Sequence, residues 1–186
     1  MKEITLQIPE GKKAEWINGV LTLVDEKKQD ITERIKTFED ACYEIGFDHP
    51  FVNAYYDCIV SNHSKSMNDH DLVAYLKLRI ITAALNEGWE PQFAKDEYRW
   101  YSYHRLITKE QYEELSDDEK RYVVYRDSST INTYYGFVYS HTYCVSSGYD
   151  SYVSSQLAFK NEKLADYAGK QFAEIYAAFC FTPKGK

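Results

Sequence analysis

The sequence predicts an α+β fold. It would comprise an N-terminal β-hairpin, a helical middle section with one central apolar helix, and an antiparallel sheet covered by a C-terminal helix. Two observations lead to this class. Helical periodicity is concentrated between residues 37 and 87 and returns after residue 160, whereas alternating strand patterns dominate residues 98–160. Helices and strands that are segregated along a chain favour α+β over a parallel α/β arrangement.

The first two apolar segments of the sequence predict a β-hairpin. Residues 4–8 alternate apolar with polar side chains, residues 20–24 form a second run, and Asn18-Gly19 just before that run is a strong turn signal. The connection is either a turn at Asn18-Gly19 or a loop over residues 9–19. A lone two-stranded hairpin is marginal in water, so we expect it to pack on the rest of the chain or on a partner.

A polar break at residues 26–30 divides the chain. We therefore expect two parts, an N-terminal β-hairpin appendage over residues 1–26 and a single α+β domain over residues 31–186.

Start and stop signals mark three helices in the middle section. Thr37 and Asp40 resemble a capping box that begins the first helix, and Pro50 suits the first turn of the second. The third helix, residues 69–87 before Gly88, is apolar over much more than one stripe, which is typical of a central, buried helix.

The second half of the chain predicts a sheet and a closing helix. Strands are expected at residues 98–107, 122–126, 134–145 and 152–160, with the last two paired as antiparallel neighbours. A final helix over residues 161–179 carries an apolar stripe and should lie across the sheet.

Charge and composition limit the partners. The 186 residues carry a net charge of −7, which opposes general binding to nucleic acid or anionic membrane. No secretory signal is visible, and the most apolar segment, residues 72–85, is interrupted by charges and too short to span a bilayer. The four cysteines show no CxxC spacing and are expected to be reduced, mostly buried thiols. These features predict a cytoplasmic protein without a membrane partner.

Three stretches are similar to a known group of proteins: residues 37–47 (TFEDACYEIGF), 71–93 (DLVAYLKLRIITAALNEGWEPQF) and 157–179 (LAFKNEKLADYAGKQFAEIYAAF). They resemble an uncharacterised family encoded by phages and mobile elements of gut Bacteroides-type bacteria. The opening segment at residues 8–11 is similar to a short N-terminal hairpin on many such proteins. The resemblance implies a phage or mobile-element context and assigns no activity, cofactor or functional residue.

No catalytic or metal-binding signature is present, and no cofactor is expected. His141 and Cys144 are three residues apart and would point to opposite faces of a strand, so a zinc site would require a bulge. The alternative to a non-enzymatic protein is a small hydrolase or modifying enzyme assembled from distant residues. His104, His141 and Cys144 would be its first candidates, and they would have to converge in a pocket.

The strongest candidate site is an aromatic-rich sheet surface. Residues 98–107 place two arginines and two tyrosines on one face, and residues 134–145 place a row of aromatic residues on one face. The proposed binding residues are Arg99, Tyr101, Tyr103, Arg105, Tyr135, Tyr139, His141 and Tyr143.

Several occupants suit such a surface. Tyrosine enrichment is typical of protein interfaces, so a protein partner or self-association is the first interpretation. A glycan or single-stranded nucleic acid could also stack on alternating aromatic residues, but residues 95–126 hold more carboxylates than basic side chains, which disfavours nucleic acid. The structural alternative is that the final helix covers these side chains as core.

Overall fold

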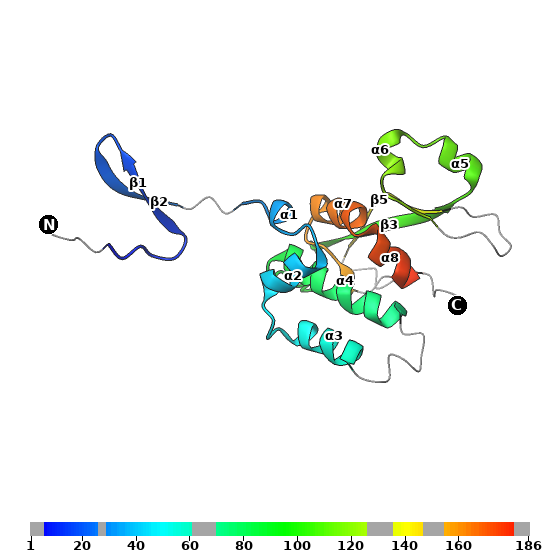
Figure 1. Cartoon of the computed structure of the whole chain (residues 1–186), viewed down its shortest axis with the longest axis horizontal. Helices are drawn as coiled ribbons and strands as arrows, with labels where there is room; N and C mark the ends of the chain where they lie inside the picture. The colour runs from blue at the N-terminus through cyan, green and yellow to red at the C-terminus, as the bar shows by residue number, and fades with distance from the viewer. Residues whose placement is uncertain (1–5, 26–28, 61–69, 126–135, 147–154, 181–186) are drawn as a thin grey trace. The chain divides into compact units, whose positions relative to one another are not determined.

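The computed structural model describes residues 6–25, 29–60, 70–125, 136–146 and 155–180 (Figure 1). The chain divides into two units, Met1–Arg34 and Ile35–Lys186, which are described separately. The structure combines helices with an N-terminal antiparallel hairpin and a three-stranded antiparallel sheet, so the α+β fold class is confirmed.

The N-terminal unit contains a hairpin and a short helix, α1 (Ile31–Arg34). β1 (Lys12–Ile17) pairs antiparallel with β2 (Val20–Asp25). Asn18 and Gly19 have φ values of 51° and 81°, the left-handed conformation that a type I′ turn requires. This two-residue turn fixes the first strand at residues 12–17. The prediction of a strand at residues 4–8 is wrong for residues 6–8, and residues 4 and 5 lie outside the described ranges.

The helical part of the second unit begins with α2 (Phe38–Ile45) and α3 (Pro50–Val60). The hydroxyl of Thr37 accepts a hydrogen bond from the backbone N–H of Asp40 (3.1 Å), and the Asp40 carboxylate accepts one from the N–H of Thr37 (2.8 Å). This reciprocal pair confirms the predicted capping box.

The central helix is α4 (His70–Asn86), which packs against α2, α3 and α8 (Ala173–Cys180). Its buried side chains lie on more than one face, as expected from its apolar sequence. They include Ala74, Leu78, Ile80, Ile81, Ala84 and Leu85.

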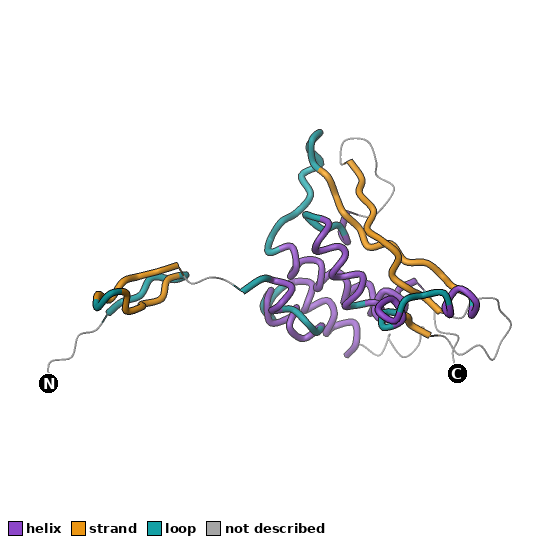
Figure 2. The backbone as a smooth tube through the Cα atoms, turned by 90° about the horizontal axis from the view of Figure 1, so that it is seen from above, coloured by secondary structure: helices purple, strands orange, loops and turns teal. Residues whose placement is uncertain are grey.

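The sheet has three antiparallel strands in the order β3-β5-β4. β3 (Tyr98–Ile107) and β5 (Gly136–Ser146) are long, whereas β4 (Val123–Tyr125) is short. Two capped helices, α5 (Lys109–Glu113) and α6 (Asp117–Lys120), connect β3 to β4. Figure 2 shows most of the helices gathered on one side of the long strands.

The C-terminal part differs from the prediction in two respects. The expected strand at residues 152–160 is wrong over its described part, because Ser155–Leu157 form a 3₁₀ helix and only Phe159 bridges to the sheet, at Trp100 of β3 rather than at β5. The expected single final helix is two helices, α7 (Glu162–Gln171) and α8, which separate at Phe172.

The break at Phe172 divides the packing of the closing helices. Phe172 has φ −113° and ψ 28°, outside helical values, and ends α7. α7 then covers β3 and β5, as predicted for a helix lying on the sheet, while α8 packs mainly on α4. Within the described ranges, no helix has the length and apolar character needed to cross a membrane.

Candidate functional site

The predicted binding residues lie in different environments. Four of them are solvent-exposed: Tyr103, Arg105, His141 and Tyr143. Two are buried, with exposed fractions of 1% for Arg99 and 5% for Tyr101. Tyr139 is half-buried under α7, and Tyr135 lies outside the described residues.

A β-bulge explains why β5 does not present one aromatic face. Tyr103 lies opposite His141, but the next residue, His104, lies opposite Tyr139, so Ser140 is an extra residue in β5. An inserted residue reverses the alternation of side chains beyond it. The side chain of Tyr139 therefore faces α7, whereas His141 faces the opposite side of the sheet.

The expectation that Tyr139, His141 and Tyr143 share a face is therefore wrong for Tyr139. Phe137, two residues before Tyr139 on β5, faces the same side of the sheet as Tyr139. Its ring stacks on that of His104, with centroids 4.7 Å apart. Both rings belong to the helix-covered side.

Three exposed side chains remain together on the other face, and we call them the tyrosine–histidine patch: Tyr103, His141 and Tyr143. The rings of Tyr103 and His141 are 4.7 Å apart, and Tyr103 and Tyr143 are 52% and 50% exposed. Tyr143 lies opposite Tyr101, one step along the same face from the Tyr103–His141 pair. The patch is thus contiguous and open to solvent.

The same face is covered at both ends. At one end Ile107, Leu115, Val123 and Val138 form a buried cluster beneath α5. At the other end Tyr101 and Val145 pack with Ala158 and Trp89. The patch is therefore an exposed aromatic surface between two covered regions of the same sheet face.

Arg99 and Tyr101 belong to the covered region. The guanidinium of Arg99 lies 5.2 Å from the ring centroid of Phe93. Burial raises the pKa of the Tyr101 hydroxyl, and the nearby Arg99 acts in the opposite direction. In this arrangement both side chains support the sheet and are not accessible to a partner.

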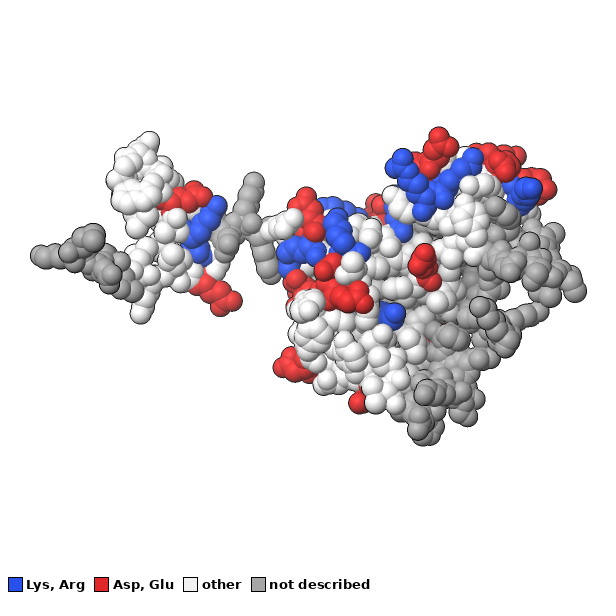
Figure 3. All heavy atoms as spheres, viewed as in Figure 1, with Lys and Arg blue, Asp and Glu red and all other residues white. Residues whose placement is uncertain are grey.

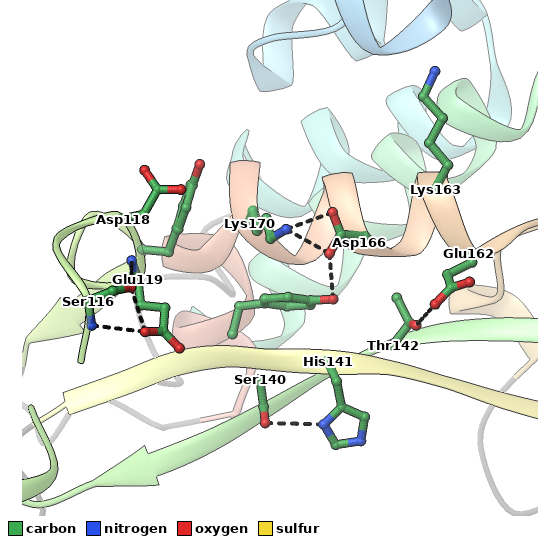
Figure 4. A pocket seen from close by; sticks show the side chains of 12 residues that line it. Ser116, Asp118, Glu119, Ser140, His141, Thr142, Glu162, Lys163, Asp166 and Lys170 are labelled. Carbon is green, nitrogen blue, oxygen red and sulfur yellow. Dashed lines mark hydrogen bonds and ion pairs between the residues drawn. The ribbon is translucent and has the colours of Figure 1, made fainter. Parts of the chain in front are cut away.

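A cleft of about 800 Å³ runs along β5 next to the patch, and we call it the β5 cleft. Its walls come from α6, β5 and α7. Figure 4 shows Asp166, Lys170, Thr142 and Glu162 on the helix side of β5, with Ser140 and His141 on the other side. The lining residues are Ser116, Asp118, Glu119, Tyr122, Tyr139, Ser140, His141, Thr142, Glu162, Lys163, Asp166 and Lys170.

A hydrogen-bonded group holds the helix side of the cleft in place. The hydroxyl of Tyr139 donates to Asp166 (2.8 Å), and the ammonium of Lys170 lies 2.8 Å from the same carboxylate. Burial, together with the hydrogen bond and negative charge of Asp166, raises the pKa of Tyr139 well above its usual value. Tyr139 therefore stays protonated and acts as a donor, not as a base.

Close packing of α7 on the sheet depends on Gly169. A Cβ atom at this position would lie 2.5 Å from Cδ2 of Tyr139 and 2.9 Å from Cβ of Ser102. The Gly169 carbonyl also accepts a hydrogen bond from Nε2–H of His104 (3.1 Å). The glycine thus sets the distance between α7 and β5 and with it the width of the cleft.

Sequence reasoning missed the α6 and α7 residues of the cleft. The signal was present in part, because Asp166 and Lys170 have the i,i+4 spacing of a helical ion pair. That spacing places both on one face of α7, but it does not reveal that Tyr139 meets them.

The candidate residues for a Cys–His enzyme do not converge. Cys144 is five residues along β5 from Tyr139, which lies opposite His104, and this separation is roughly 16 Å at strand spacing. His141 and Cys144 point to opposite faces of β5. Burial and the nearby Glu162 raise the pKa of Cys144, which disfavours a reactive thiolate.

The cysteines are less buried than expected, since Cys42 is buried but Cys180 is exposed, and all four are free thiols. In the part of the chain that the structure describes, no group of three His, Cys, Asp or Glu residues is arranged to hold a metal ion. Comparison with protein-family models, with curated proteins and with solved structures gives no match.

Proposed function

We propose that the protein is a non-enzymatic, cytoplasmic accessory protein of a phage or mobile element that acts by binding another protein through the tyrosine–histidine patch. One observation carries this proposal: Tyr103, His141 and Tyr143 lie side by side and exposed on a sheet face that is covered at both ends. Tyrosine side chains combine a large apolar ring with a polar tip, and they are enriched in protein interfaces.

The charge distribution favours a protein over a nucleic acid as the partner. On the face shown in Figure 3, basic side chains lie beside acidic ones and do not gather into one basic surface. Near the patch, Arg105 lies close enough to Glu119 to lower the pKa of that carboxyl, after the larger effect of hydrogen bonds from Ser116. A nucleic-acid groove would need an excess of basic side chains to neutralise phosphates.

Replacing Tyr103 and Tyr143 together with serine should reduce partner binding at least about tenfold, because truncated aromatic anchors at the centre of an interface typically cost more than 1 kcal/mol each. The measurement is quantitative co-purification from cells that carry the gene, with the tagged full chain at native level and mass spectrometry of the eluate.

Tyr43→Ser is the matched control, since Tyr43 is 70% exposed on α2 and belongs to no part of the patch. The control should retain the partner. A partner that co-purifies equally with the double variant and the wild type would refute the patch as the binding surface, as would the absence of any stoichiometric protein partner.

A further inference from the structure

The outer edge of β5, on the side opposite β3, is paired with another strand over only part of its described length. β4 pairs with β5 only at Gly136, Phe137 and Val138. From residue 139 to residue 145, no strand in the described ranges pairs with β5 on the side opposite β3. Alternate residues of a regular antiparallel strand direct their N–H and C=O groups to opposite edges, and in β5 the bulge at Ser140 interrupts this pattern between Tyr139 and His141. Part of the β5 backbone is therefore directed toward this outer edge, where the β5 cleft lies.

The charge of the cleft is the second observation. Four carboxylates line it against two lysines: Asp118 and Glu119 on α6, Glu162 and Asp166 on α7, with Lys163 and Lys170 also on α7. A basic ligand suits this balance better than an acidic one. The acidic side chains lie on both walls, whereas the tyrosine–histidine patch begins at His141 on the other face of β5.

We propose that the β5 cleft binds an extended basic peptide segment of the partner by strand addition to the outer edge of β5. Main-chain hydrogen bonds to residues 139–142 supply the pairing, as in other cases where a peptide extends a sheet. Side chains of an added strand alternate between the two faces. Lysine or arginine at alternate positions faces Glu162 on the α7 wall, and apolar side chains at the intervening positions face the patch. This inference rests on the proposed function and specifies its binding mode.

The probe is a blocked octapeptide that alternates lysine with valine, titrated into the isotopically labelled full-length protein and followed by amide NMR. We expect saturable shifts at residues 139–142 with a dissociation constant at or below about 1 mM. The corresponding glutamate–valine peptide should bind at least about tenfold more weakly, because it meets the carboxylates with like charge.

Backbone methylation gives the test that is specific to strand addition. Methylating one alternate set of peptide nitrogens should abolish binding, because those N–H groups face β5, while methylating the other set should be tolerated. Equal effects of the two sets, shifts that do not include residues 139–142, or no saturable binding of the lysine–valine peptide would each overturn the proposal. Concentration-dependent shifts of the same amides without peptide would identify a second copy of this chain as the occupant and would also overturn it.

Two charge variants of the protein test where the lysine side chains of the bound peptide lie. Glu162→Gln with Asp118→Asn should weaken the lysine–valine peptide by about threefold, as expected for exposed ion pairs. Glu174→Gln, which neutralises an exposed carboxylate of α8 that does not line the cleft, should leave binding unchanged. If the natural partner depends on Tyr103 and Tyr143 but the peptide fails these tests, the strand-addition mode is wrong while the proposed function stands. A partner whose binding does not depend on Tyr103 and Tyr143 would refute the proposed function itself.

Discussion

Acidification from about pH 7.5 to about pH 4.5 should reduce the free energy of unfolding by about 2.5 kcal/mol through His104. Burial lowers the pKa of His104 from 6.5 to about 4, and the hydrogen bond to the Gly169 carbonyl offsets this only in part. The aromatic rings of Phe137, Tyr139 and Tyr176 surround the imidazole. No carboxylate is among these contacts to stabilise a charged ring.

The direction follows from proton binding. The unfolded chain takes up a proton on this histidine as the pH falls through 6.5, whereas in the folded protein the same imidazole is protonated only near pH 4. The stability contributed by neutral His104 is therefore complete above about pH 6.5 and is lost progressively between about pH 6.5 and pH 4. Urea unfolding followed by circular dichroism at a series of pH values measures the loss.

His104→Gln is the informative variant because its amide N–H can still donate toward Gly169 but does not titrate. It should be less stable at neutral pH and should lose the slope above about pH 5.5. His141→Gln removes an exposed histidine from the same sheet and should keep the wild-type slope. An unchanged slope in His104→Gln would show that another group is responsible.

The carboxylates in the first turns of α2 and α6 affect the free energy of unfolding over a lower pH range. Hydrogen bonds from backbone N–H groups lower the pKa of Asp40, and hydrogen bonds from Ser116 lower that of Glu119. Their contributions are present above their ordinary pKa values and are lost as the pH falls through the lowered ones. Measurements above about pH 5.5, where these carboxylates are ionised in both states, therefore isolate the histidine.

Replacing Asn86 with alanine should destabilise the second unit by about 3 kcal/mol. Asn86 is 3% exposed at the end of α4. Its side-chain N–H donates to the carbonyl of Ala158 (2.8 Å), and its side-chain oxygen accepts from the N–H of Lys160 (3.1 Å). The substitution leaves these backbone groups without their partner in a largely buried region, where an unmade hydrogen bond costs most.

The neighbouring sheet contact should weaken as well. Phe159, between the two anchored residues, exchanges two backbone hydrogen bonds with Trp100 of β3 (2.8 and 3.1 Å). Urea unfolding and amide exchange at residues 158–160 measure the two effects.

Asn53→Ala on α3 is the matched control, because its amide also bonds a backbone carbonyl, that of Asp48, but at an exposed position. It should cost well under about 1 kcal/mol. Equal losses in the two variants would contradict the assigned role of Asn86.

Local signals predicted the helices best. The Thr37–Asp40 box, Pro50 and the apolar sequence of α4 all act through nearest neighbours or through total burial, so the sequence carries them directly. The strand pattern of β3 is similarly local, and its predicted bounds match the structure.

Non-local effects account for the errors. Nothing in the alternation of residues 134–145 marks Ser140 as a bulge residue, because the extra residue is defined only by pairing with β3. The Trp100–Phe159 bridge lies between Ala158 and Lys160, whose backbone groups bond to Asn86, far away in sequence. The cleft was missed for the same reason, since its walls come from three separate segments.

The central claim is that a partner binds the exposed part of the β3–β5 sheet. Hydrogen–deuterium exchange of the full-length protein, alone and in the purified complex with its co-purified partner, tests it most directly. The partner should slow amide exchange at residues 101–105 and 139–145 relative to the free protein. Protection confined to the β1–β2 hairpin or to α2 and α3, with unchanged exchange in β3 and β5, would contradict it.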